Sequence, residues 1–289
     1  MSQRARILLT GGTGFIGAAL SAALKARGDE VVAISRRGPV TWDGVEEEVA
    51  RADVVVHLAG EPIADERWTP QRLERIRSSR VDTTRRLAMA LATRPHARVF
   101  VSGSAIGIYG MRLDDVLCDE STPAGDDVLA RICVEWEAAA APAREAGVRV
   151  AHPRVGIVLG HGGALAKMRK PFELFAGGPI GTGRQWLSWI HLSDVVRALV
   201  FAIDRESLSG PFNCVAPAPA TMNDFARALG KALGRPSFFR VPAIALRAAV
   251  GDGVAELLLT GQRAVPRKLL EAGFQFEFPA LDEALRDLR

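Results

Sequence analysis

The feature that most constrains the fold is a short apolar run that ends in three evenly spaced glycines. In the segment ILLTGGTGFIGAAL, residues 7–20, Gly11, Gly14 and Gly17 lie between a strand-like stretch and a run of helix-forming residues. Such a turn lets a ligand approach the backbone closely, and the free N–H groups and dipole of the following helix attract an anion. The segment predicts a strand–turn–helix unit that holds a pyrophosphate; a tight turn without a ligand is the alternative. The spacing, GxxGxxG, differs from the GxGxxG of the usual dinucleotide fingerprint.

Apolar strands and helical segments alternate through the first half of the chain. Continuous apolar runs between helices are typical of a parallel sheet that is buried on both faces, and right-handed crossovers then give a doubly wound α/β sheet. Strands are expected at residues 5–10 and 30–35 and from about residues 52, 97 and 148, and helices at residues 14–27, 70–93 and 126–146.

After about residue 155 the regular alternation of strands and helices changes. Glycines crowd residues 160–163 and 177–183, which indicates loops. We therefore expect two closely packed lobes. Residues 1–155 form the nucleotide-binding domain, to which a strand and a helix return from about 188–215, and residues 156–289 form a smaller lobe on the substrate side. Helical patterns recur near residues 194–205, 222–234, 242–260 and 280–288.

Composition and charge exclude several classes of protein. The 289 residues are 48% apolar and 24% charged, which is ordinary for a globular protein. No apolar run approaches the ~18 residues of a membrane span and the N-terminus leaves no room for a signal peptide, so we expect a cytoplasmic protein without membrane contact. The basic residues behind the net charge of +4 are scattered, which does not favour binding of nucleic acid but suits an anionic small ligand.

The three cysteines, Cys118, Cys133 and Cys214, lack the spacing of a metal site, and we expect buried free thiols.

The end of the second expected strand discriminates between the two nicotinamide cofactors. An NAD site usually carries Asp or Glu there, bonded to the ribose 2′-hydroxyl. This chain instead has Ser35, Arg36 and Arg37, whose hydroxyl and guanidinium groups match a 2′-phosphate. The pattern predicts NADP rather than NAD, and two solvated surface arginines are the alternative.

Several motifs resemble those of an extended, atypical short-chain dehydrogenase/reductase. More narrowly, GGALAKM, GGPIGTGRQWLSWIH and the C-terminal tail from about residue 240 are similar to the YfcH-like, family 39U epimerase-like subgroup. The resemblance implies a Rossmann fold, an NADP site and a C-terminal extension peculiar to the subgroup. The general motifs are TGGTGFIG at residues 10–17, HLAG at 57–60, SGSAIGIYG at 102–110, PRVGIVLG at 153–160 and SWIHLSD at 188–194.

The resemblance also implies which residues bind the cofactor. The opening turn meets the diphosphate, HLAG lies near the adenosine half, and the strand end at PRV contacts the nicotinamide; Glu61, after HLAG, either touches the cofactor or caps a loop. With the 2′-phosphate residues, the implied set is Gly11, Thr13, Gly14, Phe15, Ile16, Gly17, Ser35, Arg36, Arg37, His57, Leu58, Ala59, Gly60, Glu61, Ser102, Pro153, Arg154 and Val155.

The chain departs from the general family at the catalytic pair. The family uses Tyr-x-x-x-Lys on a helix, with the tyrosine as acid/base and the lysine lowering its pKa. In LARICVEWE the corresponding places are taken by Leu129 and Cys133. Because leucine transfers no proton and a neutral thiol carries no positive charge, the standard mechanism is not available.

Few other groups are candidates for proton transfer. Ser104 matches the family serine and is expected to polarise a substrate carbonyl, unless it satisfies backbone groups at a strand end. Tyr109 follows on the ligand-binding side of the sheet, but its phenol is a weak base without a nearby cation, so packing or substrate contact is the alternative. His191 is expected to be structural, and Asp194 to cap the helix that follows.

Three polar side chains of the smaller lobe are candidates for substrate binding. Lys167, Arg184 and Gln185 lie on the expected glycine-rich loops and would clamp a substrate phosphate, as in a nucleotide sugar; solvated loop charges are the alternative. The sequence thus predicts an NADP-dependent oxidoreductase or epimerase-like protein that acts on a carbonyl or alcohol. The alternative is an NADP-binding regulatory or redox-sensing protein without turnover. No metal is expected, and a homodimer remains open.

Overall fold

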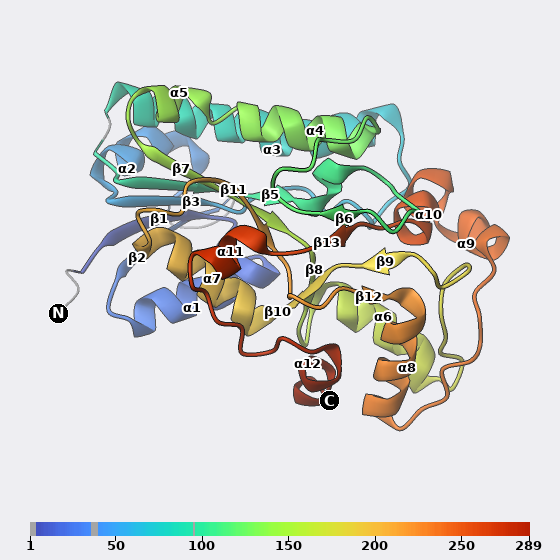
Figure 1. The fold of residues 1–289 in the computed structure, drawn as a ribbon. Helices are drawn as coiled ribbons and strands as arrows, with labels where there is room; N and C mark the ends of the chain where they lie inside the picture. Colours follow the sequence, from blue (N-terminus) through green and yellow to red (C-terminus); the bar gives the residue numbers. More distant parts are fainter. Residues whose placement is uncertain (1–3, 36–39, 95) are drawn as a thin grey trace.

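A parallel sheet at the centre of the molecule lies between two layers of helices (Figure 1). The structure is a computed structural model that describes residues 4–35, 40–94 and 96–289. The strand order is β11-β7-β4-β3-β1-β2, and all neighbours along it run parallel, so the predicted doubly wound α/β fold is confirmed. The strands are β1 (Arg6–Thr10), β2 (Glu30–Ile34), β3 (Val54–His57), β4 (Val99–Ser102), β7 (Arg149–Val155), β11 (Gly210–Cys214) and the short β5 (Ser104–Ala105), which pairs with β7.

Successive residues of each strand enter opposite helix layers, because side chains alternate across a sheet. Leu9 packs in the apolar core that includes α1 (Phe15–Ala26) and α7 (Leu192–Asp204). Leu8, its neighbour, packs in the core on the other face. The helices of that second layer are α2 (Val45–Arg51), α3 (Pro70–Thr93), α4 (Val128–Ala138) and α5 (Ala141–Glu145).

A third apolar core, formed largely by α6, α8 and α12, lies in the C-terminal part of the chain. Within the described residues, no helix is both long and apolar enough to cross a bilayer. The remaining elements are η1 (Trp42–Gly44), η2 (Ile106–Tyr109), β6 (Leu117–Cys118), β8 (Ile157–Leu159), α6 (Gly163–Glu173), β9 (Trp186–Leu187), β10 (Trp189–His191), β12 (Ala220–Thr221), α8 (Met222–Leu233), α9 (Ala243–Val250), α10 (Asp252–Leu259), β13 (Arg263–Ala264), α11 (Arg267–Glu271) and α12 (Leu281–Asp287).

Two helices that the sequence predicts as continuous are each broken in two. The predicted helix at 126–146 divides into α4 and α5, and Pro142 lies in the first turn of α5, where its missing N–H costs nothing. The predicted helix at 242–260 divides at Gly251, whose φ of 83° lies outside the helical region. The glycine stretch at 160–163 is a loop as predicted, but it ends in a helix, α6, that the sequence did not reveal.

The C-terminal tail is hydrogen-bonded to the first turn of α7. The predicted cap role of Asp194 is wrong: the helix is capped by His191, whose imidazole accepts a hydrogen bond from the N–H of Ser193. The buried carboxylate of Asp194 instead accepts the backbone N–H groups of Glu277 and Phe278, at 2.8 and 2.9 Å. A short-range capping signal was overridden by a long-range contact.

Candidate functional site

The candidate site lies where the strand order reverses. β1 pairs with β2 on one side and with β3 on the other, so the chain turns in opposite directions from the carboxyl end of β1. Open α/β sheets bind their ligands in the crevice at such a switch point. Here the crevice is bordered by the turn after Thr10 and by the segment after His57.

The turn after β1 is built from backbone because no side chain fits there. A Cβ atom on Gly17 would lie 2.1 Å from the carbonyl oxygen of Gly11, and one on Gly11 would lie 2.7 Å from the backbone nitrogen of Ala59. Gly11 also has a φ of 74°, which favours glycine. No side chain caps α1 at Gly14, and its first turn carries no acidic residue. The N–H groups at this helix end therefore remain available to an anion, and the cradle fits a dinucleotide diphosphate.

Phe15 and Ile16 contribute to this turn in a different way from the glycines. Both are partly exposed, whereas Thr13 is exposed at the tip of the turn. The ring of Phe15 lies against the glycine stretch at residues 160–163: a Cβ atom on Gly160 would be 2.6 Å from Cζ of Phe15. The Phe15 side chain thus joins α1 to the segment before α6, and its backbone N–H is one of the groups at the helix end that no side chain caps.

The side chain of His57 is held inside the protein. Its Nδ1 atom lies 2.6 Å from Oγ1 of Thr10, and its Nε2 atom lies 3.1 Å from Oγ1 of Thr83 on α3. Burial and the charge of Arg80 lower the pKa of His57 to about 3, so the imidazole is neutral. Among the predicted cofactor residues of this segment, Leu58 and Ala59 place their backbone directly behind the glycine turn.

The residues predicted to read the 2′-phosphate are only partly described. Ser35 follows β2 at the edge of the sheet where β1 also ends, because the two strands run parallel. The backbone N–H of Ser35 donates to the carbonyl of Val40. Arg36 and Arg37 lie outside the described residues, so their contact with a 2′-phosphate stays a prediction. Glu61, on the other border of the crevice, accepts a hydrogen bond from Arg72 at 3.1 Å.

Ser104 is the first member of a buried polar cluster at the ends of β5 and β7. Its hydroxyl donates to Oε1 of Glu137 at 2.7 Å, and Arg154 binds both oxygens of that carboxylate, at 2.8 and 2.9 Å. Burial alone would raise the pKa of Glu137, but Arg154 and Ser104 hold it below its usual range. Because the single hydroxyl proton is committed to a carboxylate, Ser104 can accept a hydrogen bond from a ligand but has none to donate.

Tyr109 is the second member of this cluster and is fully buried. Its hydroxyl donates to Oδ1 of Asn213 at 2.7 Å and accepts from Arg154 at 3.0 Å. Burial raises the pKa of Tyr109 to about 12 although Arg154 opposes it. The phenol is neutral and both of its hydrogen-bonding functions are occupied, which does not favour proton transfer; its acid/base role stays an untested prediction.

The other predicted residues of this region are Ser102, Pro153 and Val155. The carbonyl of Ser102, at the end of β4, lies 3.2 Å from Nδ1 of His152. Pro153 is buried in β7, and Val155 is partly exposed at its end, beside β5. Of these three residues, only Val155 is partly exposed.

The structure does not gather the three predicted substrate residues into one clamp. Lys167 lies on α6 rather than on a loop, because the helix begins at Gly163, and its ammonium pairs with Asp65. Arg184 is exposed. Gln185 is buried, and its Nε2 atom donates to two backbone carbonyls, of Ile180 and of Leu258 in α10. A substrate contact by any of the three stays a prediction.

Residues 7–214 match the sequence model of the NAD dependent epimerase/dehydratase family. The chain belongs to this family. Residues 241–288 match a second model, a domain of unknown function named DUF1731, at the place where the sequence predicts a subgroup extension.

Relatives within the epimerase/dehydratase family cover the whole chain. The epimerase family protein SDR39U1 of Bos taurus is 43% identical over 295 residues, which cover 98% of this chain and 99% of that protein. The crystal structure of human SDR39U1 (isoform 2) with NADPH is 39% identical, has a TM-score of 0.91 and covers 98% of both chains. The nucleoside-diphosphate sugar epimerase of Corynebacterium glutamicum is 33% identical, with a TM-score of 0.83, over 99% of this chain and 58% of that one. The predicted 39U epimerase-like subgroup is confirmed.

Helix α4 carries Leu129 and Cys133, the residues that the resemblance places at the positions of the family's catalytic pair. Leu129 and Cys133 are both buried, and a Cβ atom on Gly107 would touch each of them at 4.0 Å. Burial raises the pKa of the Cys133 thiol to about 12, so it carries no charge at neutral pH. The positions that a proton relay would need are filled by apolar groups.

Four side chains that bond to the predicted site residues, or that lie beside them, were missed by sequence reasoning. Arg80 and Thr83 lie on α3 among many other polar residues, and Glu137 lies on α4 close to Glu135, whereas Asn213 is a single polar residue in an otherwise apolar segment. A polar residue in apolar surroundings is the signal that could have found Asn213. Nothing in the pattern of α3 separates Arg80 from its exposed neighbours.

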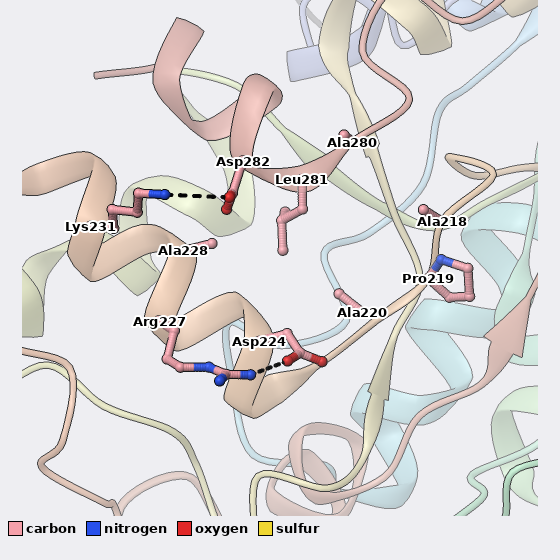
Figure 2. A pocket seen from close by; sticks show the side chains of 10 residues that line it. All are labelled: Ala218, Pro219, Ala220, Asp224, Arg227, Ala228, Lys231, Ala280, Leu281 and Asp282. Atoms are coloured by element: carbon pink, nitrogen blue, oxygen red, sulfur yellow. Dashed lines mark hydrogen bonds and ion pairs between the residues drawn. The ribbon is translucent and has the colours of Figure 1, made fainter.

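A surface cavity of about 480 Å³ lies between α8 and the start of α12 (Figure 2). Its charged side chains are already paired, Lys231 with Asp282 at 3.7 Å and Arg227 with Asp224. None of the predicted site residues lines it, so it is distinct from the crevice at β1 and β3. In the described part of the chain, His, Cys, Asp and Glu form no group of three that could hold a metal ion.

Proposed function

We propose that the protein binds NADP(H) in the crevice between β1 and β3 and acts as an oxidoreductase or epimerase on a carbonyl or alcohol. The observation that carries this proposal is the side-chain-free cradle, in which Gly17 and Gly11 leave the helix N-terminus open to a diphosphate. Human SDR39U1, 39% identical over 98% of the chain, was crystallised with NADPH, which supports the phosphorylated cofactor.

The chain's own residues would hold the cofactor in two places. The N–H groups of Phe15, Ile16 and Gly17 would bind the diphosphate, and Arg36 and Arg37 the 2′-phosphate. When bound, the cofactor supplies or accepts the hydride.

The buried cluster determines how the chain would orient a substrate. Glu137 holds the proton of Ser104, so the serine oxygen presents only lone pairs and would accept a hydrogen bond from a substrate hydroxyl. Arg154 fixes Glu137 through two bonds and keeps it ionised. This geometry favours recognition of an alcohol over polarisation of a carbonyl.

A nucleotide-linked sugar is the substrate class we favour. The 33% identical protein of Corynebacterium glutamicum is described as a nucleoside-diphosphate sugar epimerase. Of the predicted clamp residues, Lys167 and Arg184 remain exposed and are candidates for the substrate's phosphates.

A second function, cofactor-dependent regulation without turnover, is favoured by one observation. The groups at the proton-relay positions are unsuited to proton transfer: Leu129 is apolar, Cys133 is a neutral thiol, and Tyr109 has both hydrogen-bonding functions occupied. A sensor would need only the cofactor crevice.

Cofactor titration tests the proposal. We expect isothermal titration to give at least tenfold tighter binding of NADPH than of NADH, equivalent to about 1.4 kcal/mol. Arg36→Ala should remove most of that preference, and the exposed Arg98→Ala, far along the chain, serves as the matched control. Equal affinity for the two cofactors in the unmodified protein contradicts the choice of NADP, and no binding of either contradicts the proposal as a whole.

Turnover separates the enzyme from the sensor. Protein loaded with NADP⁺ is mixed with a panel of nucleotide sugars while the absorbance of the reduced nicotinamide is followed. We expect a transient signal with at least one sugar and its loss in Ser104→Ala. Tight cofactor binding without an absorbance change for any sugar of the panel favours the hypothesis of regulation without turnover.

A further inference from the structure

Arg80 is the partly buried arginine of α3 that has no carboxylate partner among the described residues; Arg85, which has none either, is exposed to solvent. Among the residues that the structure describes, none forms an ion pair with Arg80; its N–H groups donate to the carbonyls of Ile76 and Glu61, at 3.0 and 2.9 Å, and to Oγ of Ser79. Its guanidinium also lies 5.3 Å from the ring of Trp136. The arginines of the same helix that do pair with carboxylates are Arg72, Arg75, Arg77 and Arg86.

This unpaired cation lies against the crevice rather than on the outer surface of α3. A Cβ atom on Gly60 would be only 3.1 Å from Cζ of Arg80, so the glycine makes room for the guanidinium. Gly60 follows the carboxyl end of β3, and the charge of Arg80 also lowers the pKa of His57 at that strand end. Arg80 is nonetheless partly exposed, so a ligand in the crevice can reach it.

The guanidinium also stands close to Cys133, which occupies the place of the missing lysine on α4. The two side chains interact electrostatically, and each affects the pKa of the other. Burial lowers the pKa of Arg80, but a guanidinium remains charged at any accessible pH. Helix α3 therefore brings a positive charge to a place where α4 carries none.

A charge this well enclosed normally has a counter-ion, because desolvation is costly. The carboxylate of Glu61 acts on it only at a distance, as it is bonded to Arg72 instead. The predicted 2′-phosphate residues, from Ser35 onward, follow β2 on the opposite side of β1. A dinucleotide that spans the switch point thus has its nicotinamide half on the side of β3 and α4. The resemblance places HLAG near the adenosine half and PRV at the nicotinamide; Arg80 lies between them, since it packs against Gly60 of HLAG and interacts with Cys133, which also interacts with Arg154 of PRV.

We propose that Arg80 binds the ribose phosphate of the nicotinamide half of NADP(H), and so supplies the positive charge that the family takes from the lysine of its catalytic pair. The proposal rests on the proposed cofactor site. It assigns Arg80 as a binding and positioning residue, which holds the reactive half of the cofactor at the end of β3.

The experiment compares two ligands that differ in the half of the cofactor they contain. NADPH carries both halves, whereas adenosine 2′,5′-bisphosphate lacks the nicotinamide nucleotide. We expect Arg80→Gln to weaken NADPH about tenfold or more in isothermal titration, as for a lost charge-assisted bond, and to leave the bisphosphate within about twofold. Arg85→Gln, an exposed arginine on the same helix, should change neither.

Two outcomes overturn the proposal: unchanged NADPH affinity in Arg80→Gln, or equal losses for both ligands. If the unmodified protein binds neither ligand, the proposed function fails instead. Should Arg80→Gln fold poorly, Arg80→Lys replaces it; the shorter ammonium cannot bond the Glu61 carbonyl and reach a ligand together, so we expect about threefold weaker NADPH binding with the bisphosphate unchanged. An equal loss for both ligands, or no loss, in Arg80→Lys contradicts the proposal in the same way.

Discussion

The turn after β1 and the cluster around Arg154 lie at the same edge of one sheet, yet they are built in opposite ways. The turn has no side chains at Gly11 and Gly17, and its backbone donors are left for a ligand. In the cluster, the hydroxyls of Ser104 and Tyr109 and both oxygens of Glu137 are bonded within the protein.

The difference indicates which part of the candidate site is open to a ligand. Hydrogen-bond donors without a partner favour a ligand, whereas a network whose hydroxyl donors are all bonded within the protein contributes to the stability and specificity of the fold and leaves only acceptors, such as the Ser104 oxygen, to a substrate. The open turn is where the chain retains its family's sequence, and the closed cluster lies beside Leu129 and Cys133, where the chain departs from it. Variants that open the cluster or close the turn therefore test the contrast directly.

The largest effect is expected when the closed cluster is broken. Arg154→Met removes the cation that pairs with Glu137 and leaves a carboxylate that is only 15% exposed with no charged partner in the cluster, so the free energy of unfolding should fall by about 3 kcal/mol. Urea unfolding measures it.

The double variant Arg154→Met/Glu137→Met is the matched control. It leaves no buried charge unpaired and should recover most of the loss, since an apolar pair of similar volume can replace a buried ion pair. A single variant that loses less than about 1 kcal/mol would contradict the view that the cluster is structural.

The next effect is expected when the open turn is filled. Gly17→Ala places a methyl group 2.1 Å from the carbonyl oxygen of Gly11, which forces the turn to move. We expect a stability loss of about 1–3 kcal/mol and NADPH binding too weak to detect by titration. Gly44→Ala is the control, because a Cβ atom there meets nothing within 4 Å and its φ of −102° suits any residue. Retained NADPH binding in a folded Gly17→Ala protein would show that the diphosphate lies elsewhere.

The sequence was sufficient wherever a pattern is local. The apolar spacing of 70–93 predicts α3 with the bounds that the structure has, and the glycine turn and its helix lie where GxxGxxG places them. The strand alternation predicts the sheet because buried parallel strands are continuous apolar runs. These features depend on residues that are neighbours along the chain.

The sequence failed where a side chain's partner comes from far along the chain. Asp194 looks like a helix cap, but its partners are more than 80 residues away, at Glu277 and Phe278. Gln185 looks like a loop residue, yet α10 supplies its acceptor at Leu258. Arg80 resembles any arginine of a solvated helix until the fold brings Gly60 against it. Such roles require the tertiary structure.

The smallest effect on the protein at neutral pH is expected from the ionisation of Tyr109. Because Tyr109 is the one tyrosine of the chain, its phenolate can be followed directly by absorbance, and this tests whether the cluster is closed. Burial raises the pKa of Tyr109 to about 12, so the phenolate absorbance of the native protein should stay absent through pH 10 and rise only near pH 12. Tyrosine in the unfolded chain ionises near pH 10, so the contribution of Tyr109 to stability should be constant below that value and fall by about 1.4 kcal/mol per pH unit between pH 10 and 12, in addition to the fall caused by buried thiols such as Cys133. Tyr109→Phe should reduce the slope between pH 10 and 12 by that amount and leave NADPH affinity at pH 7 unchanged. A native phenolate that forms below pH 9 would instead place an ionisable acid/base beside the cofactor, and the cluster would no longer be the closed region of the site.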